Sequence, residues 1–205
     1  MSTRRTLLIA TQALPYKSEV NYIKPATLSF VEQYTTRIDT GVSPTINTTV
    51  HIKFNAENYN GGDQLCGART GTSNENRFFT FALSQKRSVL GNSVYTGVAE
   101  LGADTEILFN EYSTHRLYVN GAYIGYLCTS YIAANNNHLM LFATSGYEPN
   151  YGTSNSRIYW CKIYDADTLI RAFIPVIDFN NTPCMYDKVS KQLFYNQGTG
   201  GFTYG

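Results

Sequence analysis

The chain has 205 residues, a length that fits one β domain, with 15% charged residues and a formal net charge of +1 at pH 7. This balance lacks the concentrated basic face that phosphate binding needs, so we expect no nucleic-acid partner. No segment approaches the roughly 18 continuous apolar residues of a membrane span, so we expect no membrane partner. The apolar run at residues 7–10 is shorter than a secretory signal requires, so we expect synthesis in a cytoplasm.

Residues 1–27 differ in pattern from the rest of the chain. Residues 6–10 predict a single strand, after which Pro15 and Pro25 interrupt regular structure. Two interpretations stay open: an arm that docks on another subunit, or an edge strand that packs on its own sheet. We take residues 1–27 as an N-terminal arm or docking segment and residues 28–205 as the β-sandwich domain.

From residue 28 onward the apolar residues recur with the period of β-strands. The alternation of Val50, Ile52 and Phe54 predicts a half-buried strand. The same period predicts further strands at residues 79–83, 107–109, 139–143, 157–164 and 169–177. Helical periodicity with caps is not evident over any useful length.

Asn120-Gly121 is the strongest hairpin signal in the chain, because a type I′ turn needs positive φ at both central residues. After residue 173, short aromatic runs alternate with turns rich in Pro, Asn, Asp and Gly, a pattern typical of closing hairpins. We expect roughly eleven to thirteen strands at about 8–12-residue spacing. The sequence therefore predicts an all-β, two-sheet antiparallel sandwich.

Several motifs resemble the concanavalin A-like, laminin-G-like jelly-roll superfamily. They are R-I-D-T-G at residues 37–41, R-L-Y-V-N-G-A-Y-I-G at 116–125, and R-I-Y-W-C-K-I-Y-D at 157–165. The ending F-I-P…P-C-M-Y-D-K-V-S…F-Y-N-Q-G-T-G is similar to a variant of these modules in proteins of gut bacteria and their bacteriophages.

The resemblance covers about residues 28–205 and implies a jelly-roll sandwich. It departs at the opening, where L-S-F-V-E-Q-Y-T-T-R-I-D-T-G replaces the variant's usual Y-I-E-S-T-G-T-Q-Y-I-D-T-G. Members of the superfamily include lectins, glycan-hydrolysing enzymes, adhesion modules and virion proteins. The fold alone therefore does not select a function.

A glycosidase needs two positioned carboxylates, and Glu100, Asp104 and Glu106 are the nearest set in this chain. The stretch Gly102-Ala103-Asp104 predicts a turn, which would remove these side chains from a shared strand face. His115 and His138 each stand alone beside a strand, which is usual for structural or solvent-facing histidines. We therefore expect no catalytic residues and no enzyme.

The cysteines and histidines do not show the spacing of a metal site. No C-x-x-C occurs, and no His lies at ligand spacing from another His or Cys. Cys128 and Cys161 lie in apolar runs, as buried free thiols do, while disulfide pairing stays open. Loop 57–63 offers Glu57 and Asp63 for calcium, but a polar Asx-rich turn is the preferred interpretation. We expect no metal and no cofactor.

Sugar binding without a metal needs an aromatic face for the pyranose and amides for its hydroxyl groups. Loop 145–155 and loop 57–63 supply such residues, namely Tyr59, Tyr147, Asn150, Tyr151 and Asn155. These are the candidate glycan-binding residues. Trp160, the single Trp, lies within a strand, and we expect it in the core.

These features favour a non-catalytic bacteriophage virion protein: a capsid decoration, a head fibre or a tail-associated adhesion module, made in the host cytoplasm. Its expected partners are other virion subunits or further copies of itself, together with host or mucus glycans. The alternative is a glycan-binding, lectin-like module of a bacterial surface or secreted protein.

Overall fold

The computed structural model describes residues 13–26, 36–57, 64–69, 77–82, 87–90, 93–95, 99–127, 137–145 and 156–205. Within these ranges the chain forms seventeen β-strands. In chain order they are β1 (Ser18–Glu19), β2 (Ile23–Pro25), β3 (Ile38–Asp39), β4 (Thr48–Ala56), β5 (Gln64–Arg69), β6 (Arg77–Ala82), β7 (Arg87–Leu90), β8 (Ser93–Tyr95), β9 (Asp104–Phe109), β10 (Arg116–Val119), β11 (Ala122–Tyr126), β12 (Met140–Leu141), β13 (Ser156–Asp165), β14 (Thr168–Ile177), β15 (Pro183–Asp187), β16 (Gln192–Phe194) and β17 (Phe202–Tyr204). The described ranges contain no helix long and apolar enough to cross a membrane.

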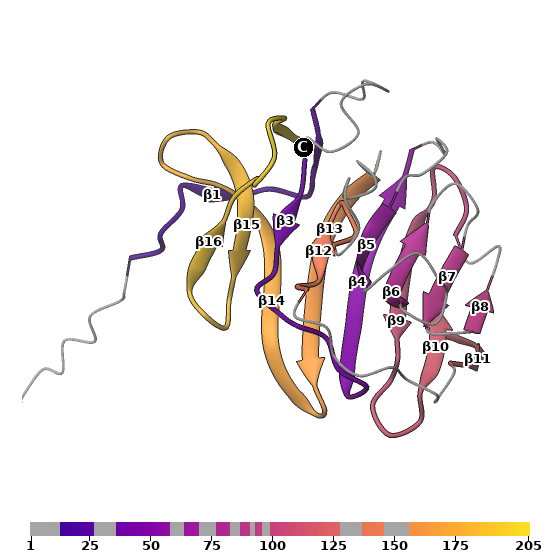
Figure 1. Ribbon diagram of the computed structural model, residues 1–205. Coiled ribbons are helices and arrows are strands. Elements are labelled where there is room, and N and C mark those ends of the chain that lie inside the picture. The colour runs from indigo at the N-terminus through magenta and orange to yellow at the C-terminus, as the bar shows by residue number, and fades with distance from the viewer. Residues whose placement is uncertain are drawn as a thin grey trace, which may run out of the picture.

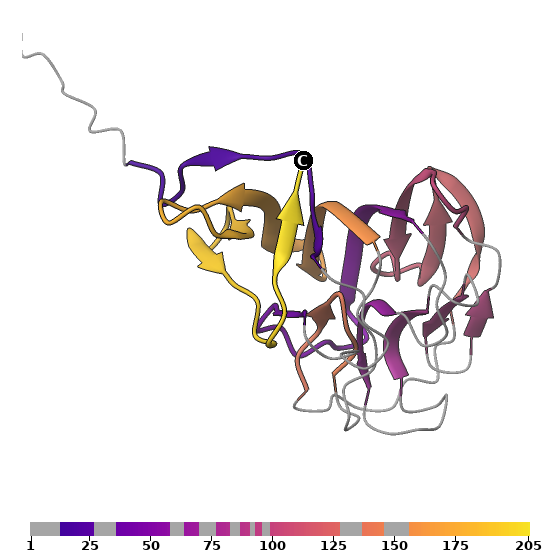
Figure 2. The same cartoon turned by 90° about the horizontal axis from the view of Figure 1, so that it is seen from above.

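The strands form two sheets, and their pairings are antiparallel. The larger sheet has the order β11-β10-β9-β4-β13-β14-β15-β16, with β1, β2 and β17 paired alongside. The smaller sheet has the order β3-β12-β5-β6-β7-β8. Viewed from above, the two sheets lie as separate layers (Figure 2). The predicted all-β, two-sheet antiparallel architecture is confirmed.

The main core lies between the two sheets. Val50, Ile52 and Phe54 of β4 are all 0% exposed, so the alternation seen in the sequence marks the inward face of this strand. Neighbouring strands add Ile107 and Phe109 from β9, and the smaller sheet adds apolar residues of β5 and β12. Burying one such large apolar side chain contributes about 1.5–3 kcal/mol, which makes this interface the main source of stability.

A β-bulge in β13 changes which of its side chains face outward. Ile158 pairs with Phe54 and Trp160 pairs with Lys53, so Tyr159 is the extra residue of the bulge. Ile158 and Cys161 are buried, while Tyr159 and Trp160 between them are half-buried on the outer face. The expectation that Trp160 lies in the core is wrong, because the bulge shifts the alternation before this residue.

The described part of the N-terminal segment packs on the body of the protein. β1 pairs with β14, β2 pairs with β13 and β17, and Ile23 is fully buried in the main core. In Figures 1 and 2 the C-terminus lies beside this indigo segment, and Gly205 O accepts hydrogen bonds from Asn21 N and Tyr22 N. Of the two interpretations left open, the packed strand therefore holds for residues 18–25. The strand expected at residues 6–10 lies outside the described residues.

A second, smaller core lies where residues before β1 cover β14 and β15. Tyr16 is 6% exposed and packs with Val176, Cys184 and Tyr186. The Tyr16 and Tyr186 ring centroids lie 4.9 Å apart. This cluster extends the hydrophobic packing to the far side of the larger sheet.

The turns follow ordinary turn chemistry in most places. Asn120 and Gly121 have φ of 49° and 78°, as the predicted type I′ turn between β10 and β11 requires. Asp187 bonds the backbone of its own turn, since its carboxylate accepts hydrogen bonds from Val189 N and Ser190 N. The strand predicted at residues 139–143 is shorter than expected, because Phe142 has φ of 63° and ends β12 at Leu141.

The predicted number of strands is too low. The described residues contain strands of only two or three residues, which are too short to show an alternating pattern in the sequence. The short strands that the sequence does not predict are β1, β2, β3 and β8, whereas β12, β16 and β17 fall where it predicts a strand or closing hairpins.

Candidate functional site

The outer face of the larger sheet carries a groove of about 430 Å³ over β13 and β14. Its aromatic part comes from β13, its apolar part from β14, and one side from the residues that follow Ser18. The lining residues are Glu19, Val20, Asn21, Lys53, Tyr159, Trp160, Lys162, Ala172, Phe173, Ile174, Pro175 and Lys188. We call this hollow the lysine groove.

Two consecutive aromatic residues line the lysine groove because of the bulge in β13. The Trp160 ring packs edge-on against the His51 ring, with centroids 4.7 Å apart and an interplanar angle of 89°. The Tyr159 ring lies 6.1 Å from the Tyr22 ring, also edge-on. Both β13 residues are half-buried, so each keeps part of its surface open to a ligand.

Three lysines surround these rings. Lys53 Nζ lies 5.3 Å from the Tyr159 ring centroid and 3.5 Å from Asp104 Oδ2. Lys162 Nζ lies 5.3 Å from the Trp160 centroid. Within the described part of the chain, neither Lys162 nor Lys188 forms an ion pair, and both are exposed.

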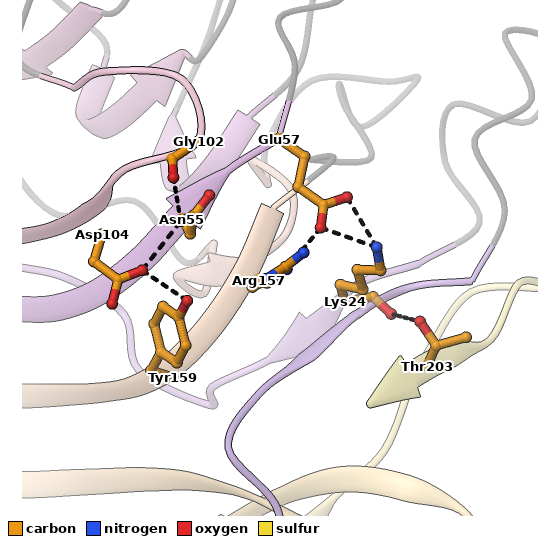
Figure 3. Close-up of polar contacts among 8 residues, drawn as sticks. All are labelled: Lys24, Asn55, Glu57, Gly102, Asp104, Arg157, Tyr159 and Thr203. Carbon is orange, nitrogen blue, oxygen red and sulfur yellow. Dashed lines mark hydrogen bonds and ion pairs between the residues drawn. The ribbon is translucent and has the colours of Figure 1, made fainter. Parts of the chain in front are cut away.

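A hydrogen-bond network fixes Tyr159 at the edge of the groove (Figure 3). The Tyr159 hydroxyl donates to Asp104 Oδ1 at 2.7 Å, and Asn55 Nδ2 donates to the same oxygen at 3.0 Å. Asn55 Nδ2 also donates to Gly102 O at 3.0 Å. The hydrogen bonds from Asn55 and Tyr159 lower the pKa of Asp104 below its ordinary value, so this carboxylate stays ionised.

A second cluster ties the N-terminal segment to the same sheet. Arg157 Nε lies 2.6 Å from Glu57 Oε1, and Lys24 Nζ lies 2.9 Å from Glu57 Oε2 (Figure 3). Partial burial acts to raise the pKa of Glu57, but the hydrogen bonds from Lys24 and Arg157 outweigh it and lower the pKa. Glu57 therefore holds β2, the end of β4 and β13 together.

Two of the three carboxylates considered for catalysis, Asp104 and Glu106, lie on the same strand. Asp104 is the first residue of β9 and not part of the preceding turn as predicted, so it shares the outer face of this strand with Glu106. Glu100 lies before the turn at Gly102, whose φ is 73°. Glu106 Oε1 lies 2.6 Å from His51 Nε2. Each strand carboxylate is therefore engaged by its neighbours on the sheet.

The other two histidines are held by local partners. His138 Nδ1 lies 2.9 Å from Asp39 Oδ1, and His115 Nδ1 lies 2.9 Å from Asn110 Oδ1. These contacts join neighbouring strands and turns, as the structural interpretation of both residues predicts.

The described residues contain no group of three or more His, Cys, Asp or Glu side chains that could hold a metal ion. Within the same ranges Cys66, Cys161 and Cys184 are free and buried, and burial raises the pKa of the Cys161 thiol above its ordinary value. Cys128, and Asp63 of the loop considered for calcium, lie outside the described residues.

A second hollow of about 340 Å³ lies on the same face, nearer the turn after β9. Its lining includes Glu111, Asp167 and Tyr164, and no lysine or arginine among the described residues. Glu111 Oε2 accepts a hydrogen bond of 3.2 Å from the Tyr118 hydroxyl. The two hollows thus present opposite charge on one sheet face.

The five glycan-binding candidates from the sequence, Tyr59, Tyr147, Asn150, Tyr151 and Asn155, all lie outside the described residues. Sequence reasoning missed Tyr159 and the outward position of Trp160. The signal was present in the spacing of Ile158 and Cys161, because two inward residues three apart require an extra residue between them. Lys53 lies between Ile52 and Phe54 on the outward face of β4, as the alternation of the inward residues requires.

No protein-family model, no curated protein and no solved structure matches this chain. The likeness to concanavalin A-like modules therefore rests on the sequence motifs alone.

Proposed function

We propose that this protein is a non-catalytic adhesion component of a bacteriophage particle that binds carbohydrate through the outer face of its larger sheet. The observation that carries the carbohydrate part is the lysine groove, where Tyr159 and Trp160 lie side by side among polar groups. Sugar rings stack on aromatic faces, and their hydroxyls need hydrogen-bonding groups nearby.

The groove is built from strands, which favours a preorganised binding surface. Tyr159 is held by its hydrogen bond to Asp104, and Trp160 by its contact with the His51 ring. Asn21 and Glu19 add an amide and a carboxylate at the side of the groove. A saccharide would therefore meet side chains that lose little conformational freedom on binding.

The non-catalytic part of the proposal is supported by the state of the strand carboxylates. Glycoside cleavage needs one carboxyl group as an acid and another as a nucleophile or base. Asp104 is ionised and committed to Asn55, Tyr159 and Lys53, while Glu106 is bound to His51. Neither is free to act on a bound sugar without breaking these contacts.

The location on a particle is proposed from the likeness of the ending to modules of gut bacteria and their bacteriophages. Other particle subunits or further copies of the chain would then be its partners, with host or mucus glycans as ligands. A bacterial surface or secreted lectin-like protein is the alternative, and it would use the same groove.

Binding of the full-length protein to a glycan array tests the carbohydrate part. We expect a subset of glycans to be retained, and Trp160→Ala to abolish their binding. Tyr123→Ala is the matched control, because Tyr123 is 48% exposed on β11, away from the groove lining. A flat array obtained with folded protein, or equal loss in both variants, contradicts the proposal.

Two further measurements test the remaining parts. Mass spectrometry of purified particles should detect the chain in stoichiometric amounts, whereas its absence from particles favours the surface or secreted alternative. Retained glycans incubated with the protein should be recovered intact. Cleavage that disappears in Glu106→Gln would show that the protein is an enzyme.

A further inference from the structure

We propose that the lysine groove selects saccharides that carry an anionic group, a carboxylate or a sulfate. This inference rests on the proposed carbohydrate function and adds the chemical class of the ligand. Among the lining residues three ammonium groups, of Lys53, Lys162 and Lys188, face one carboxylate, that of Glu19. The lining residues alone therefore carry a formal charge of +2, against +1 for the whole chain.

Two of the lysines flank one small residue. Lys162 of β13 pairs directly with Ala172 of β14. On the other side of β14, Lys188 N donates a backbone hydrogen bond of 2.9 Å to Ala172 O. The two lysines therefore stand on backbones on either side of Ala172, whose methyl group leaves space between them. We place the anion subsite over Ala172.

The neighbouring carboxylates do not neutralise these two ammonium groups. Glu19 Oε1 accepts a hydrogen bond of 2.8 Å from the Tyr16 hydroxyl. Asp104 lies 3.5 Å from Lys53 Nζ and also accepts from Tyr159. Asp187 Oδ1 accepts a hydrogen bond of 2.7 Å from Ala172 N, but this carboxylate is 0% exposed, accepts from two further backbone N–H groups of its turn, and lies 3.7 Å from Arg171 Nε. Lys162 and Lys188 keep their hydrogen-bonding capacity for an anionic group of a ligand.

The subsite lies next to the aromatic part of the groove. Lys162 Nζ is 5.3 Å from the Trp160 ring centroid, so an anion bound by Lys162 brings its sugar ring beside the indole. The two halves of the groove therefore bind different parts of the ligand, because Trp160 and Tyr159 contact the sugar ring while the two lysines contact the charged group. A neutral saccharide would use the aromatic half only.

Direct binding of three defined probes tests this inference. The probes are tetragalacturonate, its carboxyl-reduced neutral counterpart, and a sulfated galactose tetrasaccharide, each titrated calorimetrically against the full-length protein at low and at high salt. We expect one of the anionic probes to bind about tenfold or more tightly than the neutral one at low salt, and the preference to shrink at 1 M salt, where charges are screened over about 3 Å.

Variants distinguish the contribution of the lysine charges to binding from that of the aromatic rings. Lys162→Gln/Lys188→Gln should remove the anionic preference and leave weak binding of the neutral probe. Lys17→Gln/Lys191→Gln, which changes two exposed lysines outside the groove, is the matched control and should keep the preference. Ala172→Leu, which fills the space between the lysines without changing the charge, should also lower the affinity for the anionic probe.

The outcomes distinguish the inference from the function on which it rests. Equal binding of anionic and neutral probes, lost in Trp160→Ala, overturns the anionic preference but leaves carbohydrate binding in place. Anionic binding that falls equally in both lysine double variants is a general charge effect and also overturns it. If neither these probes nor any array glycan binds, the proposed function and the inference both fail.

Discussion

Tyr159 and Asp104 form a hydrogen bond of 2.7 Å although they lie on strands that are not neighbours. Tyr159 belongs to β13 and Asp104 to β9, and β4 runs between them. The phenol ring therefore reaches across β4, where Lys53 Nζ lies 5.3 Å from its centroid (Figure 3 shows the Tyr159 and Asp104 contact). This bond fixes the position of the ring at the edge of the lysine groove.

We expect Tyr159→Phe to lower the free energy of unfolding by about 0.5–1.5 kcal/mol, because it removes one hydrogen bond and keeps the ring. It should also raise the pKa of Asp104, since one of the two main groups that lower it is lost. Urea unfolding measures the first effect, and NMR titration of the side-chain carboxylates measures the second. Tyr204→Phe, at an exposed position outside this network, should do neither. An unchanged Asp104 pKa would contradict the assignment.

Glu57 predicts a specific acid dependence of stability. Its pKa is lowered in the folded state, so its contribution is present above the unfolded pKa, near the ordinary value of 4.5, and is lost as the pH falls through the folded pKa. Glu57→Gln should cost about 1 kcal/mol at pH 7, because the cluster is partly exposed, and the difference from the wild-type protein should vanish in strong acid. Chemical denaturation at a series of pH values gives the measurement.

Glu100→Gln is the control for this pH series, because Glu100 is exposed and forms no ion pair within the described residues. Its stability should follow that of the wild-type protein at every pH. A Glu57→Gln variant that stays less stable to the same degree in strong acid would show that the side chain acts through packing and not through charge.

Tyr16 should be essential for the packing of the N-terminal segment. Tyr16→Ala removes a ring that is 6% exposed and packs on Tyr186, so we expect a loss of about 3 kcal/mol in thermal or urea unfolding. Tyr16→Phe keeps the ring and loses only the hydrogen bond to Glu19, so its cost should stay below about 1.5 kcal/mol. Equal effects of the two variants would contradict burial as the cause.

Tyr16 also predicts how the stability of the protein changes at high pH. Burial raises the pKa of Tyr16 to about 12 from an ordinary value of 10.0. Because the folded pKa is the higher one, this contribution is complete below pH 10.0 and is lost as the pH rises toward 12. Tyr16→Phe should therefore lose less stability than the wild-type protein over this interval, as measured by urea unfolding.

The sequence predicts the regular parts of the fold well. Val50, Ile52 and Phe54 alternate over a long unbroken strand, and Asn120-Gly121 fixes a tight turn by backbone chemistry, so both features are readable locally. The short strands β1, β2, β3 and β8 could not be predicted, because pairing of two or three residues depends on what lies beside them in space. The N-terminal segment is an example: Ile23 is buried only because β13 and β17 flank it.

The candidate site was harder to predict from the sequence, because it also depends on how the strands pair. Alternation alone places Trp160 inside with Ile158, and only the pairing with β4 shows that Tyr159 is inserted and Trp160 faces out. The placement of Lys162 and Lys188 on either side of Ala172 depends on the register of β13, β14 and the turn that follows β15, which the sequence pattern does not give. The composition gives the net charge of the chain but not where charged side chains gather on its surface.

The bulge in β13 makes this strand sensitive to changes in its length. On either side of Tyr159 the strand pairs regularly with β4, with Ile158 against Phe54 and Cys161 against Ile52. Two residues therefore separate Ile158 from Cys161, while one residue separates Phe54 from Ile52. Deleting Tyr159 would leave Ile158 against Phe54 and Cys161 against Ile52 in a regular ladder without the bulge, and it would remove one of the two aromatic rings of the lysine groove. A chain that presents two adjacent aromatic side chains on this face must therefore keep the extra residue between Ile158 and Cys161, whereas Tyr159, Trp160 and Lys162 can be substituted without changing the pairing with β4.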